Sequence, residues 1–310
     1  MELQASVSDH ATARSNPVNT YIAEHILPRK DQMAGFWSAG ELEAVAGLND
    51  LRLELTKGEL WKVVRDEYVA WRKRHEHDMA QHACFEFKWQ RTAYMRFMGR
   101  DIAPMHAEFP KTSEILRRSP FTSAGFYSMQ PTSKLNPHRG VHSGILRYHL
   151  GLVIPDEGSR FVLCNMKPGI HRPGARVQRD IQDCDHGNRF RQYHLEEGAD
   201  WVFDDTDIHY ATTPASDQDR VVFLADFPRP NLPWLLRWLN AEALRYLLHQ
   251  IPSVKQYPDA YNNHYLKMAA MPVTDPEHLP EYQCAMDDLH DMDSFETRDH
   301  KIQSRGPPPG

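Results

Sequence analysis

The chain has 310 residues, of which 41% are hydrophobic and 25% charged, a composition typical of a soluble globular protein and not of a collagen-like, coiled-coil or disordered chain. Its 36 Lys and Arg residues against 42 Asp and Glu residues give a net charge of −6, which repels phosphate backbones and argues against nucleic acid as the partner. Small molecules or peptides are therefore the expected partners.

The sequence also predicts a compartment. Four cysteines occur without a CxxC pair, which favours reduced thiols: Cys84, Cys164, Cys184 and Cys284. No stretch of the sequence approaches the ~18 uninterrupted apolar residues of a membrane span, and the start MELQASVSDHATARSN lacks the basic-then-apolar layout of a secretory signal. We therefore expect a cytoplasmic protein.

The first part of the chain is expected to form a polar, flexible arm at 1–30 and a helical support region at 31–120. Between Ala39 and His77, apolar and charged residues alternate at helical spacing, which predicts about two helices. One buried stripe is predicted from residues three or four positions apart: Trp61, Val64, Tyr68 and Trp71.

From 121 to 230 the sequence changes to short runs rich in Val, Ile, Phe, Tyr and Leu, separated by Gly, Pro, Asn and Asp. This pattern indicates strands and turns. Strands are predicted near Gly125–Gln130, Ile145–Ile154, Phe161–Asn165, Gln192–Leu195, Trp201–Phe203, Ile208–Thr212 and Arg220–Phe227. This many short strands in about a hundred residues suggests a sandwich or jelly roll.

Two segments fall outside this pattern. Met166–Phe190 is long and polar for a connection, and its mixture of arginines and aspartates predicts either a lid that selects an acidic substrate or an ordinary loop. A helical region is expected at 231–286, before a flexible tail at 287–310. Its run WLLRWLNAEALRYLLHQI has a broad apolar arc, which we expect to pack against the sheet. A membrane-surface or partner-binding helix is the alternative.

Imidazole and guanidinium groups are concentrated in the strand-rich region: His138, His142, His149, His209, Arg147 and Arg220. In non-heme oxygenases, imidazoles bind iron(II) while adjacent coordination positions of the iron stay open for a co-substrate and dioxygen. The co-substrate 2-oxoglutarate also needs a cation at its far carboxylate, and arginine pairs with a carboxylate through two parallel hydrogen bonds. Arg220, on a strand expected to end inside the barrel, is the candidate for that cation.

Two long stretches carry a family resemblance: PHRGVHSGILRYHLGLVIP at 137–155 and FDDTDIHYATTPASDQDRVVFLADFPRP at 203–230. They resemble motifs of the aspartyl/asparaginyl β-hydroxylases, a family of Fe(II)/2-oxoglutarate-dependent oxygenases that includes the lipid A 2-hydroxylases. The resemblance implies a mainly β protein with flanking helices, whose catalytic core at 121–230 is a double-stranded β-helix (jelly roll, cupin-like). The implied cofactors are Fe(II), 2-oxoglutarate as co-substrate, and O2.

The resemblance also implies roles for six residues. Two ligate the iron and one pairs with 2-oxoglutarate, and these are the expected catalytic residues: His138, His209 and Arg220. Three more are expected to hold the co-substrate: Ser128, Arg147 and His149. His142 and His186 match no position of the family.

Gly140 lies two residues after His138, where most 2-oxoglutarate oxygenases and the lipid A 2-hydroxylases place a carboxylate ligand. The peptidyl Asp/Asn hydroxylases look like this chain, with glycine there and two protein ligands. We therefore expect a two-histidine hydroxylase. The alternatives are a halogenase, with chloride in the vacant position, and ligation by Asp205 or Asp207.

The expected reaction is hydroxylation of an unactivated C–H bond of an amino-acid, peptide or other small-molecule substrate, with release of succinate and CO2. Hydroxylation of a lipid acyl chain is an alternative, although membrane contact is not favoured. A non-catalytic, cupin-like metal-binding protein or a degenerate family member is another alternative. Arg220 argues against a bare metal binder, because such a protein needs no cation eleven residues after its second ligand.

Overall fold

The computed structural model describes residues 36–74, 90–138, 144–155, 159–164, 190–205 and 207–243, with the backbone alone described at 90–92, 134, 136–138, 190 and 191. The helices are α2 (Ala39–Leu42), α3 (Leu48–Thr56), α4 (Leu60–Arg74), α6 (Ala103–Glu108), α7 (Pro110–Arg117) and α9 (Trp234–Glu242). The strands are β1 (Gln90–Phe97), β2 (Arg100–Asp101), β3 (Ser123–Met129), β4 (Lys134–His138), β5 (Ile145–Val153), β6 (Arg160–Cys164), β7 (Phe190–His194), β8 (Asp200–Phe203), β9 (His209–Thr212) and β10 (Arg220–Pro228).

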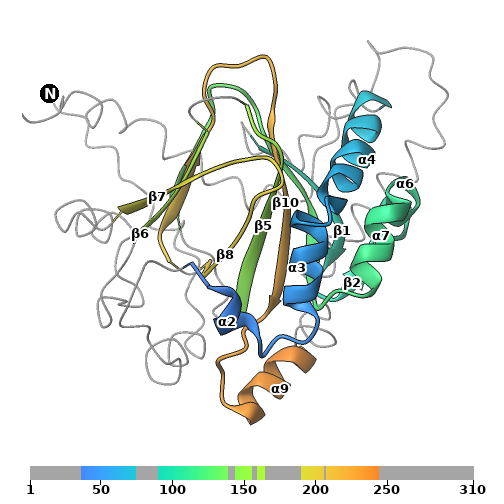
Figure 1. Ribbon diagram of the computed structural model, residues 1–310, viewed down its shortest axis with the longest axis vertical. Coiled ribbons are helices and arrows are strands. Elements are labelled where there is room, and N and C mark those ends of the chain that lie inside the picture. Colours follow the sequence, from blue (N-terminus) through green and yellow to red (C-terminus); the bar gives the residue numbers. More distant parts are fainter. Residues whose placement is uncertain are drawn as a thin grey trace, which may run out of the picture.

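These strands form two antiparallel sheets. The larger has the order β2-β1-β3-β10-β5-β8 and the smaller has the order β4-β9-β6-β7. Figure 1 shows the sheets facing each other, with α3, α4, α6 and α7 along the outer side of the larger sheet. The expected fold class, a mainly β double-stranded β-helix with flanking helices, is confirmed.

The larger sheet divides its side chains between two cores. Alternate residues of β5 and β10 pack beneath the helices: Leu146, Tyr148, Leu150, Leu152, Val221, Phe223, Ala225 and Phe227. Because side chains of a strand point alternately to opposite faces, the intervening residues face the interior between the sheets. There Val222 joins Phe161 and Phe203 in a second core.

Helix α4 covers the outer face of the larger sheet through the predicted stripe. Val64, Tyr68 and Trp71 are buried, and the Tyr68 ring lies 4.9 Å from that of Phe126 on β3. Trp61, at the start of the helix, is only partly buried. The stripe is thus confirmed for three of its four residues, since three- and four-residue steps keep them on one side of a helix.

Three strands were not expected from the sequence: β1, β2 and β4. Strand β1 lies within the region 31–120 assigned to helices, yet it pairs with β3 and so extends the sheet. His138, expected just before a strand, is the last residue of β4. Proline removes a ladder donor and is tolerated on edge strands, and β4, which contains Pro137, is an edge of the smaller sheet.

The expectation for the helix after Pro230 is wrong in one respect. Helix α9 is attached to the barrel through Asn240, whose Nδ2 donates to the Gly144 carbonyl over 2.7 Å. Its large apolar side chains are instead exposed: Trp234, Leu235, Trp238 and Leu239. No helix in the described ranges is long and apolar enough to cross a membrane.

Cys164, the last residue of β6, is disulfide-bonded. The expectation of reduced thiols is therefore wrong at this position. The other three cysteines, like Gly140, His142, His186 and most of the inserted stretch 166–190, lie outside the described residues.

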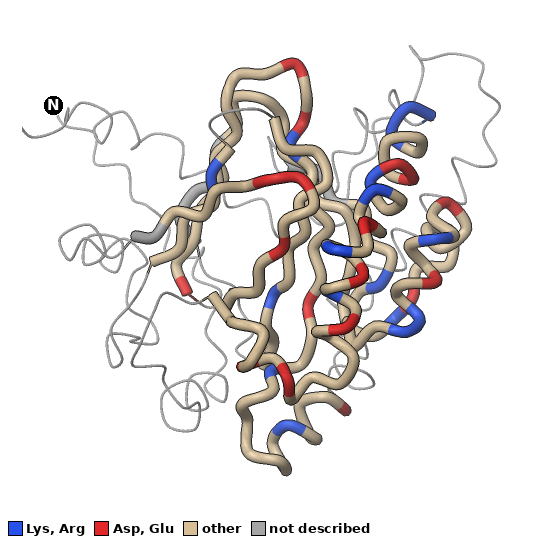
Figure 2. Tube along the Cα trace, in the orientation of Figure 1, with Lys and Arg blue, Asp and Glu red and all other residues tan. Residues whose placement is uncertain are grey.

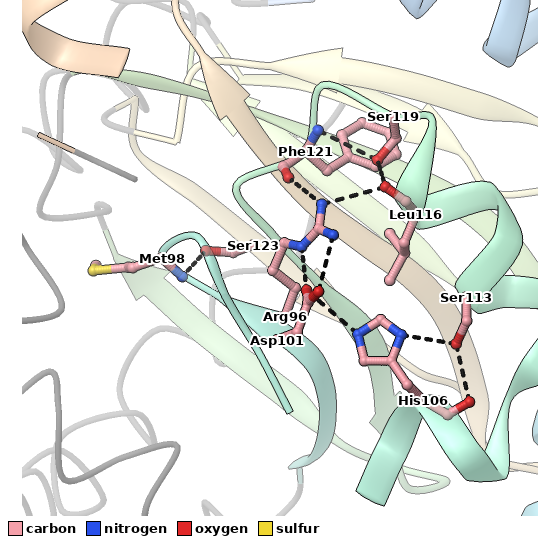
Figure 3. A network of polar contacts seen from close by, with 9 residues as sticks. All are labelled: Arg96, Met98, Asp101, His106, Ser113, Leu116, Ser119, Phe121 and Ser123. Carbon is pink, nitrogen blue, oxygen red and sulfur yellow. Dashed lines mark hydrogen bonds and ion pairs between the residues drawn. The ribbon is translucent and has the colours of Figure 1, made fainter. Parts of the chain in front are cut away.

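A polar network fastens the β1–β2 hairpin to the helices (Figure 3). Arg96 donates to Asp101 over 2.5 Å and to the carbonyl oxygens of Leu116 and Phe121 over 3.2 and 3.1 Å. His106 lies between Asp101 and Ser113, its Nδ1 2.8 Å from Ser113 Oγ. Burial alone would raise the pKa of Asp101, but His106 and Arg96 hold it well below its usual range.

A prediction concerns Gly151, two residues after His149 on β5. A Cβ there would overlap the backbone carbonyl of Glu196, which cannot move as a side-chain end can. We expect Gly151→Ala to lower the free energy of unfolding by about 2 kcal/mol, as overpacking does. Gly40→Ala is the control, because a Cβ at Gly40 has no neighbour within 4 Å. Equal unfolding midpoints in urea for the two variants would contradict the prediction.

Candidate active site

The two histidines expected to bind iron come together through strand pairing. His138 on β4 and His209 on β9 are register partners in the smaller sheet. Directly opposite residues of antiparallel strands have Cα atoms roughly 4.5 to 5.5 Å apart. The backbone therefore brings together residues that are 71 positions apart in the sequence. The side chain of His138 is outside the described part of the structure.

His209 is held in one orientation. Its side chain is buried, and its ring lies 5.1 Å from that of Phe203 and 5.7 Å from that of Phe161. Nδ1 is 2.8 Å from the Asp207 carbonyl oxygen and must be the donor, because a carbonyl can only accept. When the ring is neutral, its lone pair is then on Nε2. A backbone carbonyl that fixes the tautomer in this way is typical of metal-binding histidines.

His149 on β5 faces the interior and lies among three aromatic rings. The ring centroids of Trp201, Phe203 and Phe161 are 5.1, 5.1 and 5.7 Å away. Its side chain is 6% exposed, and neither nitrogen has a hydrogen-bond partner among the described residues. Burial, with the nearby charges of Arg220 and Arg147, lowers the pKa of His149 well below its usual value. The imidazole is therefore neutral, with two unused polar atoms.

Arg220 begins β10 and is 2% exposed. Its Nη1 donates to Met129 Sδ over 3.0 Å, and its Nε has no partner. Within the described ranges no carboxylate lies at ion-pair distance from this guanidinium, and burial lowers its pKa to about 10. A buried charge without a partner is costly. The arrangement suits an anionic ligand that enters the interior.

Arg147 differs from Arg220 because it is already neutralised. Its guanidinium donates to both carboxylate oxygens of Asp226, over 2.8 and 3.2 Å, and to Asp205 over 2.5 Å. Burial opposes the charge, but the two carboxylates raise the pKa of Arg147 well above its usual value. Asp205 Oδ1 also lies 3.5 Å from His209 Nε2. Arg147 therefore connects β10 to the predicted metal ligand, and its role toward 2-oxoglutarate stays a prediction.

The structure does not bring Ser128 into this group. Its register partner is Val221, which packs beneath the helices, so Ser128 is on the face of β3 opposite to that of Arg220. Its hydroxyl donates to Asp219 over 3.0 Å. The sequence comparison identified a serine by its distance from His138, whereas strand alternation decides which face a residue occupies. A co-substrate contact by Ser128 is therefore not supported.

Tyr127 and Asp226 are interior residues that the sequence analysis missed. Tyr127 packs against the interior core, and its partner on β10 is Val222, two residues from Arg220. Burial raises the pKa of Tyr127 above its usual value, whereas the charge of Arg220 lowers it. Asp226 had a signal in the sequence: an aspartate in the apolar strand VVFLADF needs a buried partner.

The residues present fit an iron ion and 2-oxoglutarate in part. His209, whose Nδ1 contacts a backbone carbonyl, and its register partner His138 would provide two nitrogen ligands. A buried guanidinium without a carboxylate suits the far end of a dicarboxylate. Among the described side chains, no three from His, Cys, Asp and Glu are grouped as metal ligands, and His138 is not among those side chains.

A second arrangement, Asp101–His106–Ser113, has the residue types of a hydrolase triad (Figure 3). Ser113 is fully buried, and its hydroxyl donates to the Phe109 carbonyl over 2.8 Å. A nucleophile must reach its substrate, so this cluster is structural.

Comparisons with known proteins bear on the family. A family model described as aspartyl/asparaginyl beta-hydroxylase matches residues 58–230, more than half of the 310-residue chain. The ornithine lipid ester-linked acyl 2-hydroxylase of Rhizobium tropici is 32% identical over 122 residues, which cover 39% of this chain and 35% of that protein. The match thus spans about a third of the length of that relative.

Two solved structures are similar in part. AviO1 from Streptomyces viridochromogenes has a TM-score of 0.36 and 12% identity, covering 72% of this chain and 99% of that one. HygX from Streptomyces hygroscopicus, with nickel and 2-oxoglutarate bound, has a TM-score of 0.34 and 13% identity, covering 53% of this chain and 78% of that one. These scores are too low to support an inference about chemistry.

Asp226→Asn tests the Arg147 network. We expect the free energy of unfolding to fall by about 2 kcal/mol, because a buried guanidinium loses a charged partner. Urea unfolding of the metal-free protein measures this. The control is Glu114→Gln, which removes an exposed pair with Lys111 at 3.8 Å and should change the value by less than about 0.5 kcal/mol. Equal losses in the two variants would show that the network adds no stability.

A second prediction concerns pH. Burial raises the pKa of Asp205 from 3.8 to about 6, against the opposing effect of Arg147. The folded state then holds this proton more tightly than the unfolded state. The stabilisation of the folded state by protonated Asp205 is therefore fully present below pH 3.8 and is lost as the pH rises through about 6. In EDTA, wild type should lose stability relative to Asp205→Asn between these values. A difference that is independent of pH would contradict this.

Proposed function

Because the chain belongs to the aspartyl/asparaginyl β-hydroxylase family, we propose that it is an Fe(II)- and 2-oxoglutarate-dependent dioxygenase. The proposed reaction hydroxylates an unactivated C–H bond and releases succinate and CO2. The preferred substrate is an amino acid, a peptide or another small molecule. The reaction type follows the family, whereas the residues that carry it are inferred from the interior of the barrel.

The observation that carries this proposal is the state of Arg220. Its guanidinium is 2% exposed and has no carboxylate partner within the described ranges, while that of Arg147 has two. A protein that only bound a metal would gain nothing from an uncompensated buried cation. A dicarboxylate co-substrate supplies the missing charge, and a planar guanidinium can bind it through two hydrogen bonds.

Four residues of the chain would bind the iron and 2-oxoglutarate. His209 Nε2 and His138 would hold the iron, with the Asp207 carbonyl keeping the His209 ring in its orientation. Arg220 would bind the far carboxylate of 2-oxoglutarate. The neutral His149 would donate a hydrogen bond to the same molecule from one of its unpaired nitrogens. When bound, iron and 2-oxoglutarate supply the oxidising chemistry, which no side chain can provide.

The surroundings of these groups would exclude water. Phe161, Trp201 and Phe203 are each at most 3% exposed and surround His149. An apolar wall strengthens the charge interaction of Arg220 with a ligand, because water is not available to screen it. The same wall limits side reactions of an oxidising centre.

The third protein ligand position of the iron would fall at Gly140, which lies outside the described residues. We favour a two-histidine site. Asp205 is close to His209 Nε2, but its carboxylate is engaged by Arg147 and burial favours its protonated form. Ligation by Asp205 would require that pair to open. A halogenase, with chloride at this position, stays the alternative.

One relative favours a second candidate substrate, the acyl chain of a lipid. The Rhizobium tropici protein, 32% identical over 122 residues, is named an ornithine lipid ester-linked acyl 2-hydroxylase. A cytoplasmic location also stays a prediction, and the disulfide at Cys164 removes one of the reasons for it.

Arg220→Met tests the proposal. Without ligand, we expect the variant to be as stable as wild type or up to about 2 kcal/mol more stable, since a buried unpaired charge has been removed. With anaerobic Fe(II), 2-oxoglutarate should raise the melting temperature of wild type and leave that of the variant unchanged. Arg160→Met, at an exposed position of β6, should respond like wild type.

Turnover separates the candidate functions. Wild type should form succinate with one substrate class from amino acids, peptides and acyl lipids, and the product should be 16 mass units heavier than the substrate. A product carrying chlorine, formed only with chloride present, would identify a halogenase. Binding of Fe(II) without a visible charge-transfer band on addition of 2-oxoglutarate would support the metal-binding protein instead. His209→Ala should abolish iron binding, and normal succinate formation by this variant would contradict the assigned ligand.

A further inference from the structure

Helix α9 carries an exposed apolar surface, here called the α9 face: Trp234, Leu235, Trp238 and Leu239. The exposed fractions of these side chains are 75%, 47%, 56% and 47%. At 3.6 residues per turn, they occupy one arc of about 140°. Among the described residues, the other large apolar side chains that are exposed lie apart from this arc on α3 and α4: Leu53, Val63 and Val69.

The α9 face is held outward by the opposite side of the helix. Asn240 Nδ2 donates to the Gly144 carbonyl over 2.7 Å, and Leu232, just before the helix, is 7% exposed. The helix is thus fastened at both of these points to the barrel, and Figure 1 shows it beyond the end of the sheets. The exposure therefore follows from how α9 is attached.

Few charges interrupt this surface. Figure 2 shows residues of both signs along α3, α4 and α7, whereas the charged residues of α9 are Arg237 and Glu242. Arg237 is exposed beside the arc, where it can meet an anionic group. A surface of tryptophan and leucine with one adjacent arginine matches the order of layers at a membrane surface, namely acyl chains, carbonyl region and anionic headgroups.

The size of the α9 face argues against a second protein as its partner. A stable protein–protein interface needs about 800 Å² on each side. The described part of helix α9 has nine residues, so it is roughly 13 Å long and its one face offers only a fraction of that area. Within the described residues it is also shorter than the roughly 20 residues that a helix needs to cross a bilayer. Insertion of a few side chains into a membrane surface needs neither a large interface area nor a helix that spans the bilayer.

We propose that the α9 face binds a lipid membrane surface, with Trp234 and Trp238 at headgroup level and the two leucines against the acyl chains. Tryptophan suits this position because its ring is apolar and its N–H can still reach a polar partner. The contact would hold Gly144, which directly precedes β5 and is three residues before Arg147, next to the bilayer. This surface goes beyond the proposed reaction and does not depend on it.

Flotation with lipid vesicles tests the proposal. The 310-residue chain, without iron, is mixed with vesicles of phosphatidylcholine containing about one third phosphatidylglycerol. We expect wild type to float with the vesicles and to remain bound at high salt, because burial of apolar side chains is not screened. A wild-type protein that stays at the bottom of the gradient would overturn the proposal.

Two matched double variants identify the surface. Trp234→Ser with Trp238→Ser should weaken the partition at least about tenfold, because each large apolar side chain contributes on the order of tenfold to an equilibrium. Trp234→Phe with Trp238→Phe keeps the apolar area and should stay within about threefold of wild type. Leu53→Ser on α3, which removes a side chain 56% exposed, should bind like wild type. An equal loss in Leu53→Ser and in the serine pair would overturn the proposal.

Brominated lipids provide an independent readout. Quenching of tryptophan fluorescence by vesicles of dibrominated phosphatidylcholine should occur in wild type and fall in the phenylalanine pair, although that pair still floats. Quenching that is equal in both would place other tryptophans at the membrane and overturn the assignment to α9. Light scattering gives the oligomeric state of the same samples. If wild type were a dimer that did not bind vesicles, and if only the serine double variant were a monomer, the α9 face would be a protein interface. That result would overturn the proposal.

Discussion

The register between β5 and β10 is the constraint on which the rest of the site depends. Arg147 is opposite Asp226, and His149 is opposite Leu224, across two neighbouring strands of the larger sheet. Because the side-chain period of a strand is two, a slip of one residue would turn every one of these groups toward the helices. The apolar residues between them, packed under α4, prevent that slip. The pairing of β5 with β10 thus places the hydrophobic core on one face of the sheet and the polar interior on the other.

The interior contains two arginines in opposite states. Arg147 is surrounded by acceptors and stabilises the strands, whereas Arg220 is buried without a carboxylate partner among the residues that the structure describes. The local sequence does not predict this difference, because both arginines lie in apolar strands. The contrast between them is what separates a structural guanidinium from one that is prepared for a ligand, and it motivates a dicarboxylate as the co-substrate.

Much of the barrel could be predicted from the sequence, because apolar runs between turn residues define strands such as β5, β9 and β10. The pairing of His138 with His209 could be suggested only through a family resemblance, since they are 71 positions apart. Ser128 lies on the face of β3 that the helices cover, which spacing along the chain does not determine. Strand β4 was missed because Pro137 looks like a turn residue until the edge position is known. The outward orientation of α9 likewise depends on its contact at Gly144, which no local pattern predicts.

A comparison of two ligands tests the central claim, which is that Arg220 binds the far carboxylate of 2-oxoglutarate. Calorimetric titration of anaerobic Fe(II)-loaded protein with 2-oxoglutarate should show one site, and 2-oxopentanoate, which has the same chain without that carboxylate, should bind at least about 30-fold more weakly. The loss reflects a buried guanidinium that remains unpaired. Equal affinity for the two ligands, or no binding of 2-oxoglutarate, would contradict the account.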